Sequence, residues 1–153
     1  MRLLLFIASL FLACVPEAPA IAASDRVAVV RVIDGDTLVI RNHEEKEERI
    51  RLIAIDSPEM NYGKGSPECG AREATAALRA LVSTEVRIDR VRKDDYGRTL
   101  AWVWNDGAAS VNEQLLRDGH AEIFRKERHA DRERFRKIEN QARAARLGMW
   151  GCD

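Results

Sequence analysis

Five short strand-like runs separated by turn signals limit this chain to few folds. The first two, residues 27–33 and 37–41, are rich in β-branched residues and flank an Asp-Gly-Asp turn at residues 34–36. An Asp-Gly turn between alternating runs predicts a β-hairpin. A third run at residues 48–55 extends the hairpin into an antiparallel meander, which Ser57-Pro58 ends. The last two runs are residues 86–91 and 100–104.

Helices are predicted after the third and the fifth strand. Residues 68–81 have apolar residues at helical spacing, residues 110–119 begin with a Ser-x-x-Glu capping box, and residues 131–147 are amphipathic. The inward positions expected on the first and last helices are Ala71, Ala74, Leu78, Leu81, Phe135, Ile138, Ala142 and Ala145. This order predicts an α+β, mainly β fold: a five-stranded Greek-key OB-fold barrel with three helices.

The first 23 residues have the pattern of a secretory signal peptide. Arg2 precedes an apolar run, and small residues follow it at the expected cleavage region. The run is far shorter than the ~20 residues that a membrane-spanning helix needs. We therefore expect export, periplasmic or secreted, and one mature domain at residues 24–153. A lipid anchor on Cys14 is disfavoured, because Phe11 and Leu12 make a poor lipidation signal.

Removal of the signal peptide leaves two cysteines, Cys69 and Cys152. Two cysteines in an oxidising compartment predict one disulfide, which would link the segment before the first helix to the C-terminus.

The charge balance limits how this chain can bind polyanions. The sequence has 25 lysine and arginine residues and 25 aspartate and glutamate residues, so its formal net charge is zero. Bulk electrostatic attraction to nucleic acid is not indicated, and any such binding must come from local clusters. We interpret the charge-rich residues 125–137 as a solvated helix face.

Acidic residues on neighbouring turns suggest a site for a hard cation. Asp34 and Asp36 lie in the hairpin turn, and Asp56 ends the third strand. Calcium and magnesium prefer such oxygen ligands, with water in the remaining positions. Arg51 on the same strand suits a phosphate, because its planar fork donates bidentately. With Glu59 as a spare carboxylate, these groups predict phosphodiester chemistry.

Several of these segments resemble the staphylococcal nuclease (thermonuclease) family in order and spacing. They are residues 32–37, 51–59 and 96–98, followed by 100–101 and 111–113. The resemblance covers residues 27–150 and implies an OB-fold endonuclease that uses Ca²⁺ to hydrolyse DNA and RNA. By analogy we expect 3'-phosphate ends, a preference for single-stranded or denatured substrate, and a monomer without a stable membrane span.

The resemblance implies a set of metal ligands. Asp36 and Asp56 match the carboxylate ligands, and Ser57 contributes its backbone carbonyl. The serine replaces a threonine of the family's type member, which a carbonyl ligand tolerates.

It also implies residues for catalysis and substrate binding. Glu59 matches the general base that orients the attacking water, and Tyr96 matches a tyrosine that contacts the substrate phosphate. Arg51 and Arg98 match the pair that stabilises charge developing on the phosphoryl oxygens and the leaving group.

The chain also departs from the family pattern. Asp95 replaces a phosphate-contacting lysine, residues 124–128 contain one aromatic residue where the type member has two tyrosines, and the loop after Glu59 is shorter and carries only Lys64. We expect the chemistry to be retained and the grip on substrate to be altered.

The alternative is a noncatalytic OB-fold module that binds nucleic acid or protein. Such a module has no need to keep a complete reactive set. The chain has all five of Asp36, Arg51, Asp56, Glu59 and Arg98, and this favours an enzyme.

Overall fold

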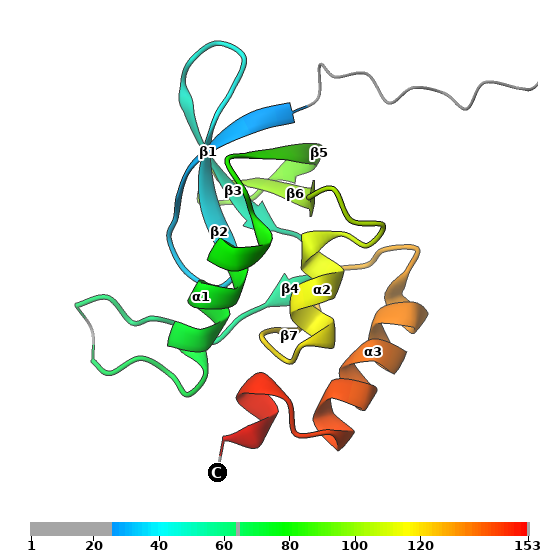
Figure 1. Cartoon of the computed structure of the whole chain (residues 1–153). Helices are drawn as coiled ribbons and strands as arrows, with labels where there is room; N and C mark the ends of the chain where they lie inside the picture. Colours follow the sequence, from blue (N-terminus) through cyan, green and yellow to red (C-terminus); the bar gives the residue numbers. More distant parts are fainter. Residues whose placement is uncertain (1–25, 64, 153) are drawn as a thin grey trace, which may run out of the picture.

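A closed β-barrel forms the first part of the computed structural model, which describes residues 26–63 and 65–152 (Figure 1). The strand order is β1-β2-β3-β6-β5, and β1 also pairs with β5 to close the barrel. All pairs are antiparallel except β3 with β6. The strands are β1 (Arg26–Val32), β2 (Thr37–Arg41), β3 (Glu47–Leu52), β5 (Glu85–Lys93) and β6 (Thr99–Trp104). The predicted barrel and its opening meander are confirmed.

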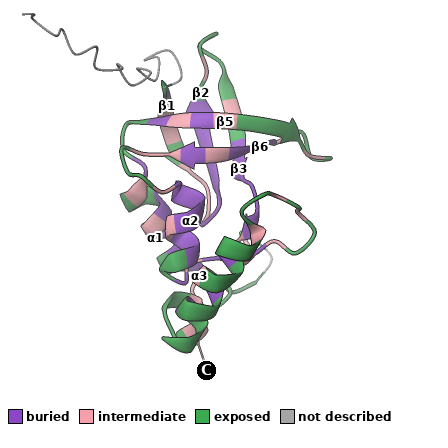
Figure 2. Ribbon diagram, turned by 90° about the vertical axis from the view of Figure 1, so that its right-hand side faces the viewer, coloured by how far each residue is buried: buried purple, intermediate pink, exposed green. Residues whose placement is uncertain are grey.

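Three helices lie below the barrel in the view of Figure 1. They are α1 (Ala71–Leu81), α2 (Val111–Arg117) and α3 (Arg132–Ala144), and a 3₁₀ turn, η2 (Gly148–Gly151), follows α3. As predicted, Ser110 caps α2, since its hydroxyl accepts a hydrogen bond from the backbone N–H of Glu113. Figure 2 shows buried residues on the barrel strands, α1 and α2, whereas most of α3 is exposed.

The third predicted strand is split, which corrects its expected range of residues 48–55. β3 ends at Leu52 because Ala54 adopts a left-handed conformation (φ 70°). The next two residues, β4 (Ile55–Asp56), leave the barrel and pair with β7 (Glu122–Ile123). The sequence did not predict this two-stranded sheet, which brings Asp56 beside the segment that precedes α3.

The predicted ends of two helices were also wrong. The first begins at Ala71 and not at residue 68, since Gly70 takes a left-handed conformation (φ 86°) that the helix cannot include. The last ends at Ala144 and not at residue 147, because Arg146 is left-handed (φ 52°). Ala145, expected to point inward, is therefore exposed, while the other inward positions are at least partly buried.

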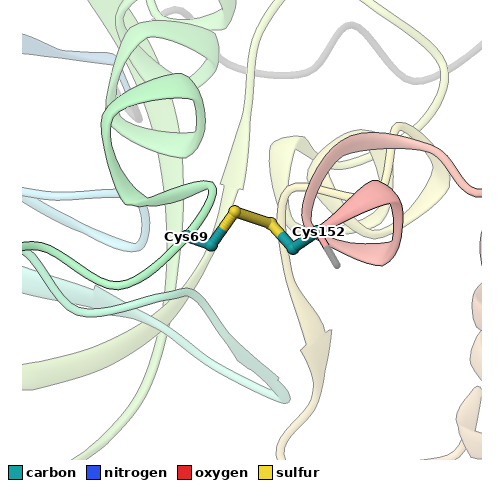
Figure 3. The surroundings of a disulfide bond; sticks show 2 residues. All are labelled: Cys69 and Cys152. Atoms are coloured by element: carbon teal, nitrogen blue, oxygen red, sulfur yellow. A yellow bond between two sulfur atoms is a disulfide. The ribbon is translucent and has the colours of Figure 1, made fainter.

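A disulfide joins Cys69 and Cys152, as the sequence predicted (Figure 3). It links the segment before α1 to the residue after η2 across 83 positions of sequence. Closing so long a loop contributes about 4 kcal/mol in the chain-entropy model.

The expected signal peptide at residues 1–23, Cys14 and Lys64 lie outside the described residues. Among the residues that are described, no helix has the length and apolar character needed to span a membrane.

Candidate active site

One cavity of about 420 Å³ gathers most of the residues singled out in the sequence; we call it the site cavity. It opens between the end of β3, β4, the β5–β6 hairpin and the segment after β7. The predicted residues that line it are Arg51, Asp56, Glu59, Tyr96 and Arg98. Asp36 and Ser57 do not line it, because both are buried: Asp36 pairs with Arg51, and Ser57 donates to Asp36.

Arg51 is the most constrained residue of the site. Its Nη1 donates to the backbone carbonyls of Leu52 and Ile55 at 2.6 and 2.7 Å. Its Nε lies 3.0 Å from Asp36 Oδ1, and its Nη2 donates to Asp56 Oδ1 at 2.5 Å. A guanidinium has five N–H groups: three donate these hydrogen bonds, that of Nε is taken up by the ion pair with Asp36, and one on Nη2 remains. Groups of the protein itself therefore contact most of the Arg51 N–H groups that the sequence suggested for phosphate binding.

Asp36 is held by donors on both carboxylate oxygens. Oδ1 accepts from Thr37 Oγ1 at 3.0 Å in addition to its ion pair with Arg51. Oδ2 accepts from the backbone N–H of Ser57 at 2.8 Å and from its hydroxyl at 2.9 Å. The hairpin turn and the start of the segment after β4 are therefore fixed to each other through one carboxylate.

The carboxylates of Asp34, Asp36, Asp56 and Glu59 repel one another. Burial and the neighbouring Asp36 raise the pKa of Asp34 to about 6. Burial also raises the pKa of Asp56, where repulsion from Asp36 and Glu59 adds to burial and Arg51 opposes it. Among the described residues only Asp36 and Asp56 pair with Arg51, so the cluster that also includes Asp34 and Glu59 carries excess negative charge. A bound cation would offset this charge.

In the part of the chain that the structure covers, no group of three or more His, Cys, Asp and Glu side chains is arranged to hold a metal ion. Two carboxylates, a backbone carbonyl and water would still satisfy a hard cation such as calcium.

Glu59 extends into the site cavity on a loop. Its backbone N–H donates to Glu68 Oε2 at 2.8 Å, and the backbone N–H of Glu68 donates to the carbonyl of Glu59 at 3.0 Å. The loop is thereby tied across its base. The carboxylate of Glu59 is exposed and has no hydrogen bond or ion pair within the described residues, so it is free to accept a proton or orient a water.

The β5–β6 hairpin supplies Tyr96 and Arg98. Asp94 holds the turn: its Oδ1 accepts from the backbone N–H groups of Tyr96 and Arg98, and its Oδ2 accepts from Arg98 Nε at 2.7 Å. Burial works to raise the pKa of Asp94, but these hydrogen bonds outweigh it and hold the pKa below its usual value. The Arg98 guanidinium also lies 5.5 Å from the Tyr96 ring centroid.

Four further charged residues of the cavity were missed in the sequence: Arg92, Asp94, Lys126 and Glu127, the last of which pairs with Arg92. Asp94 had a signal that could have found it, because an aspartate at the start of a turn commonly accepts from backbone N–H groups two to four residues later. Arg92 and Lys126 had none, since they belong to segments that only the fold brings together. Asp95, which departs from the family pattern, also lines the cavity.

Comparisons with known proteins agree with the resemblance seen in the sequence. Residues 49–152 match the family model described as staphylococcal nuclease homologue. A thermonuclease of Staphylococcus hyicus is 34% identical over 126 residues, which cover 80% of this chain and 73% of that protein. An uncharacterized endonuclease of Escherichia coli O157:H7 is 32% identical over 133 residues, 86% of this chain and 81% of its own length. Protein ParB of Escherichia coli is 35% identical over 133 residues, 82% and 72% of the two chains.

Proposed function

The chain belongs to the staphylococcal nuclease family and is a phosphodiester hydrolase that acts on nucleic acid, and on this premise we propose that it is an exported, calcium-dependent endonuclease. Its substrates are DNA and RNA in single-stranded or denatured form, it leaves 3'-phosphate ends, and it works as a monomer. The observation that carries the proposal is the convergence of Arg51, Asp56, Glu59, Tyr96 and Arg98 on one cavity.

We assign the calcium ligands to Asp36, Asp56 and the Ser57 carbonyl. The support is electrostatic. The pKa values of Asp34 and Asp56 are raised, in part by the neighbouring carboxylates, so the negative charge of the cluster is greater than Arg51 neutralises. When bound, calcium would neutralise the phosphodiester and help to supply the nucleophile.

Glu59 has the role of general base. It lines the site cavity, and its carboxylate has no competing partner in the described residues. In this role it orients a water molecule for in-line attack on phosphorus and accepts the proton that the water loses.

Arg51 and Arg98 stabilise the charge that develops on the phosphoryl oxygens and on the leaving group. Both are held before substrate arrives, Arg51 by its four partners and Arg98 by Asp94. Preorganised donors need no reorganisation during the reaction, and losing one typically costs on the order of 3 to 4 kcal/mol of barrier.

The residues available to bind substrate differ from those of the family's type member. Tyr96 is 86% exposed beside the cavity and can contact a phosphate through its hydroxyl. Asp95, which stands where the type member has a lysine, repels phosphate, and Lys126 adds a cation from another segment that lines the same cavity. Arg92 is less available, because it pairs with Glu127 at 2.5 Å.

The disulfide supports export, because such bonds persist in oxidising compartments. Fractionation of cells that express the whole chain tests this part. A cytoplasmic protein that retains residues 1–23 would contradict it.

The enzymatic test is degradation of denatured DNA and RNA by purified residues 24–153, with calcium and then with a chelator. We expect calcium-dependent cutting, its loss in Glu59→Ala, and no change in Glu44→Ala, a glutamate of the β2–β3 turn that pairs only with Lys46. End-labelling of the products reports whether the phosphate stays at the 3' end.

A folded, calcium-supplied protein that binds denatured DNA without cutting it would favour the noncatalytic binding module instead.

A further inference from the structure

A second cavity of about 320 Å³ lies beside the site cavity, between α3 and the segment that follows β7; we call it the arginine cavity. Besides Ile123 and Asn140, every residue that lines it is charged. The charged residues are Arg125, Arg132, Arg136, Glu139 and Arg143. Four arginines and one glutamate give it a positive character, although the whole chain has no net charge.

Two of these arginines have no carboxylate partner among the described residues. Arg125 is exposed, and its side chain makes no ion pair or hydrogen bond there. Arg132 donates to two backbone carbonyls, that of Glu127 at 2.6 Å and that of Arg125 at 3.2 Å. Carbonyl oxygens satisfy hydrogen bonds without cancelling a formal charge, so both positive charges remain.

The other two arginines are only partly neutralised. Arg136 pairs with Glu133 at 3.0 Å, but both side chains are more than half exposed, and such pairs contribute little. Arg143 lies 3.4 Å from Glu122 and 3.7 Å from Glu139, and its guanidinium stacks 3.8 Å from the Trp150 ring centroid.

Glu139 is the one acid that lines the arginine cavity, and its charge is not directed at a ligand. Its side chain is only 7% exposed, and its Oε1 accepts from the backbone N–H of Ile123 at 2.9 Å. Glu139 thus links α3 to β7 from a buried position, and the accessible charged side chains of the cavity are those of the arginines.

One short segment separates the two cavities. Phe124 and Lys126 line the site cavity, whereas Ile123 and Arg125 line the arginine cavity. A turn closed by the Glu127 N–H and the Phe124 carbonyl shapes this segment, and Arg132 holds it from the helix side. Arg125 and Lys126, which are adjacent in the sequence, therefore place one positive charge in each of the two cavities.

We propose that the arginine cavity is a second phosphate-binding site, which holds the backbone of a single-stranded polynucleotide where it leaves the site cavity. This proposal rests on the proposed function and extends it to the path of the substrate. OB folds typically contact roughly 4 to 16 nucleotides, more than one cleavage site accommodates. Arginine clusters are suited to the phosphate groups of such a strand, whatever its base sequence. In this proposal, part of the charged run at residues 125–137, interpreted from the sequence as a solvated helix face, binds phosphate.

The test compares two double variants with the same change in net charge. Arg125→Glu with Arg136→Glu reverses two exposed residues of the arginine cavity, and Arg72→Glu with Arg79→Glu reverses two exposed residues of α1. α1 lies on the far side of α2 from α3 (Figure 1), so the control leaves the arginine cavity intact. Thermal unfolding of each protein verifies the fold.

Binding is measured with a fluorescently labelled single-stranded oligonucleotide in chelator, across a range of salt concentrations. We expect the cavity variant to bind roughly tenfold or more weakly at low salt, with a salt slope smaller by about 0.7 for each phosphate that the variant no longer neutralises. The control should change binding less than about twofold, since its charges lie away from the strand. Arg125→Lys with Arg136→Lys should retain most of the affinity.

Hydrolysis of long and short substrates gives a second readout. The cavity variant should lose more activity on long single-stranded DNA, through KM, than on a dinucleotide that reaches only the site cavity. If the proposed function fails, the unmodified protein cuts neither substrate, but oligonucleotide binding still tests the arginine cavity. Equal weakening in both double variants, no weakening in the cavity variant, or no measurable binding by the unmodified protein would each overturn the proposal.

Discussion

Arg51 and Arg98 face the same cavity, but two different kinds of structure hold them. Arg51 belongs to the barrel wall, which we define as Gly35, Asp36, Arg51, Asp56 and Ser57 with the neighbouring Asp34. Its side chain is 10% exposed, donates three hydrogen bonds and forms a further ion pair with Asp36. Arg98 belongs to the hairpin wall, residues 94–98, where Asp94 is its ion-pair partner and its side chain is 28% exposed.

The electrostatics of the two walls differ in the same way. In the barrel wall, burial and mutual repulsion raise the pKa of Asp34 to about 6 and also raise that of Asp56. In the hairpin wall, hydrogen bonds from Arg98 and Tyr96 overcome burial and lower the pKa of Asp94. In the barrel wall the same contacts hold the fold together and position the candidate catalytic groups. In the hairpin wall the hydrogen bonds and the ion pair lie within the hairpin. Mutations should therefore affect stability in one wall and spare it in the other.

The largest effect is expected for Arg51→Ala. It should lower turnover on denatured DNA by about 100-fold or more and the free energy of unfolding by about 3 to 5 kcal/mol, because two carboxylates lose a buried partner. Turnover and urea unfolding measure both. Arg49→Ala is the control, since Arg49 is exposed on the same strand. An unchanged unfolding free energy would show that the barrel wall does not depend on this arginine.

Arg98→Ala should separate activity from stability. We expect a similar loss of turnover, about 100-fold, from the missing donor, but a change of less than about 1 kcal/mol in unfolding, as for other partly exposed ion pairs. The same two measurements apply. A loss of stability equal to that of Arg51→Ala would remove the distinction between the walls.

A pair of glycine variants compares the packing of the walls. A Cβ at Gly35 would lie 2.7 Å from both Ala74 Cβ and Ser57 Oγ, whereas a Cβ at Gly97 would meet nothing within 4 Å. Gly35→Ala should cost about 1 to 3 kcal/mol by overpacking and disturb the Asp36–Ser57 contact, which also lowers turnover. Gly97→Ala should cost about 1 kcal/mol, because its φ of 76° is strained for alanine. Thermal unfolding in chelator ranks the two, and an equal or larger cost at Gly97 would contradict the comparison.

The smallest effects concern pH, measured in chelator. The raised pKa of Asp34 means that the folded state binds its proton more tightly than the unfolded state, whose pKa is ~3.9. Its contribution to stability is therefore lost as the pH rises from about 4 to about 6, and Asp34→Asn should stabilise the protein at pH 7 by about 1 to 2 kcal/mol and not at pH 3. Added calcium should remove this gain.

Asp94→Asn should have the opposite sign. Because the pKa of Asp94 is lowered, its carboxylate stabilises the folded state above the unfolded pKa of ~3.9, and this contribution is lost as the pH falls through the lowered value. The variant should lose less than about 0.5 kcal/mol at pH 7, since the ion pair with Arg98 is partly exposed, and nothing at pH 2. Denaturant unfolding at several pH values measures both variants, and the same sign for both would refute the electrostatic contrast.

Much of the fold could be predicted because its signals are local. The Asp-Gly turn, the alternating runs and the Ser110 cap each depend on neighbours in sequence. The pairing of Cys69 with Cys152 followed from their number outside the expected signal peptide. What was missed depends on single backbone conformations: Ala54 and Arg146 are left-handed without being glycine, so no pattern marks the end of β3 or of α3.

The candidate site divides along the same line. Its residue types could be identified because phosphodiester chemistry needs carboxylates for a cation, a base and fixed positive charge, and these lie in recognisable turns. How far these side chains are buried, and how many of their hydrogen-bonding groups remain free for substrate, could not be predicted. Only the fold shows that Leu52 and Ile55 take two donors of Arg51, and that Asp36 is buried behind it.

The amino-acid sequence by itself determined the barrel and the family and proposed the candidate site residues, because strand periodicity, turn residues and motif spacing are properties of short segments. The tertiary structure alone decided which charges remain free. Arg125 and Arg132 belong to the same charged run as Arg136. Only the folded structure shows that, within the described residues, the first two have no carboxylate partner whereas Arg136 pairs with Glu133. Neutralisation depends on partners distant in sequence, and folding brings those partners together.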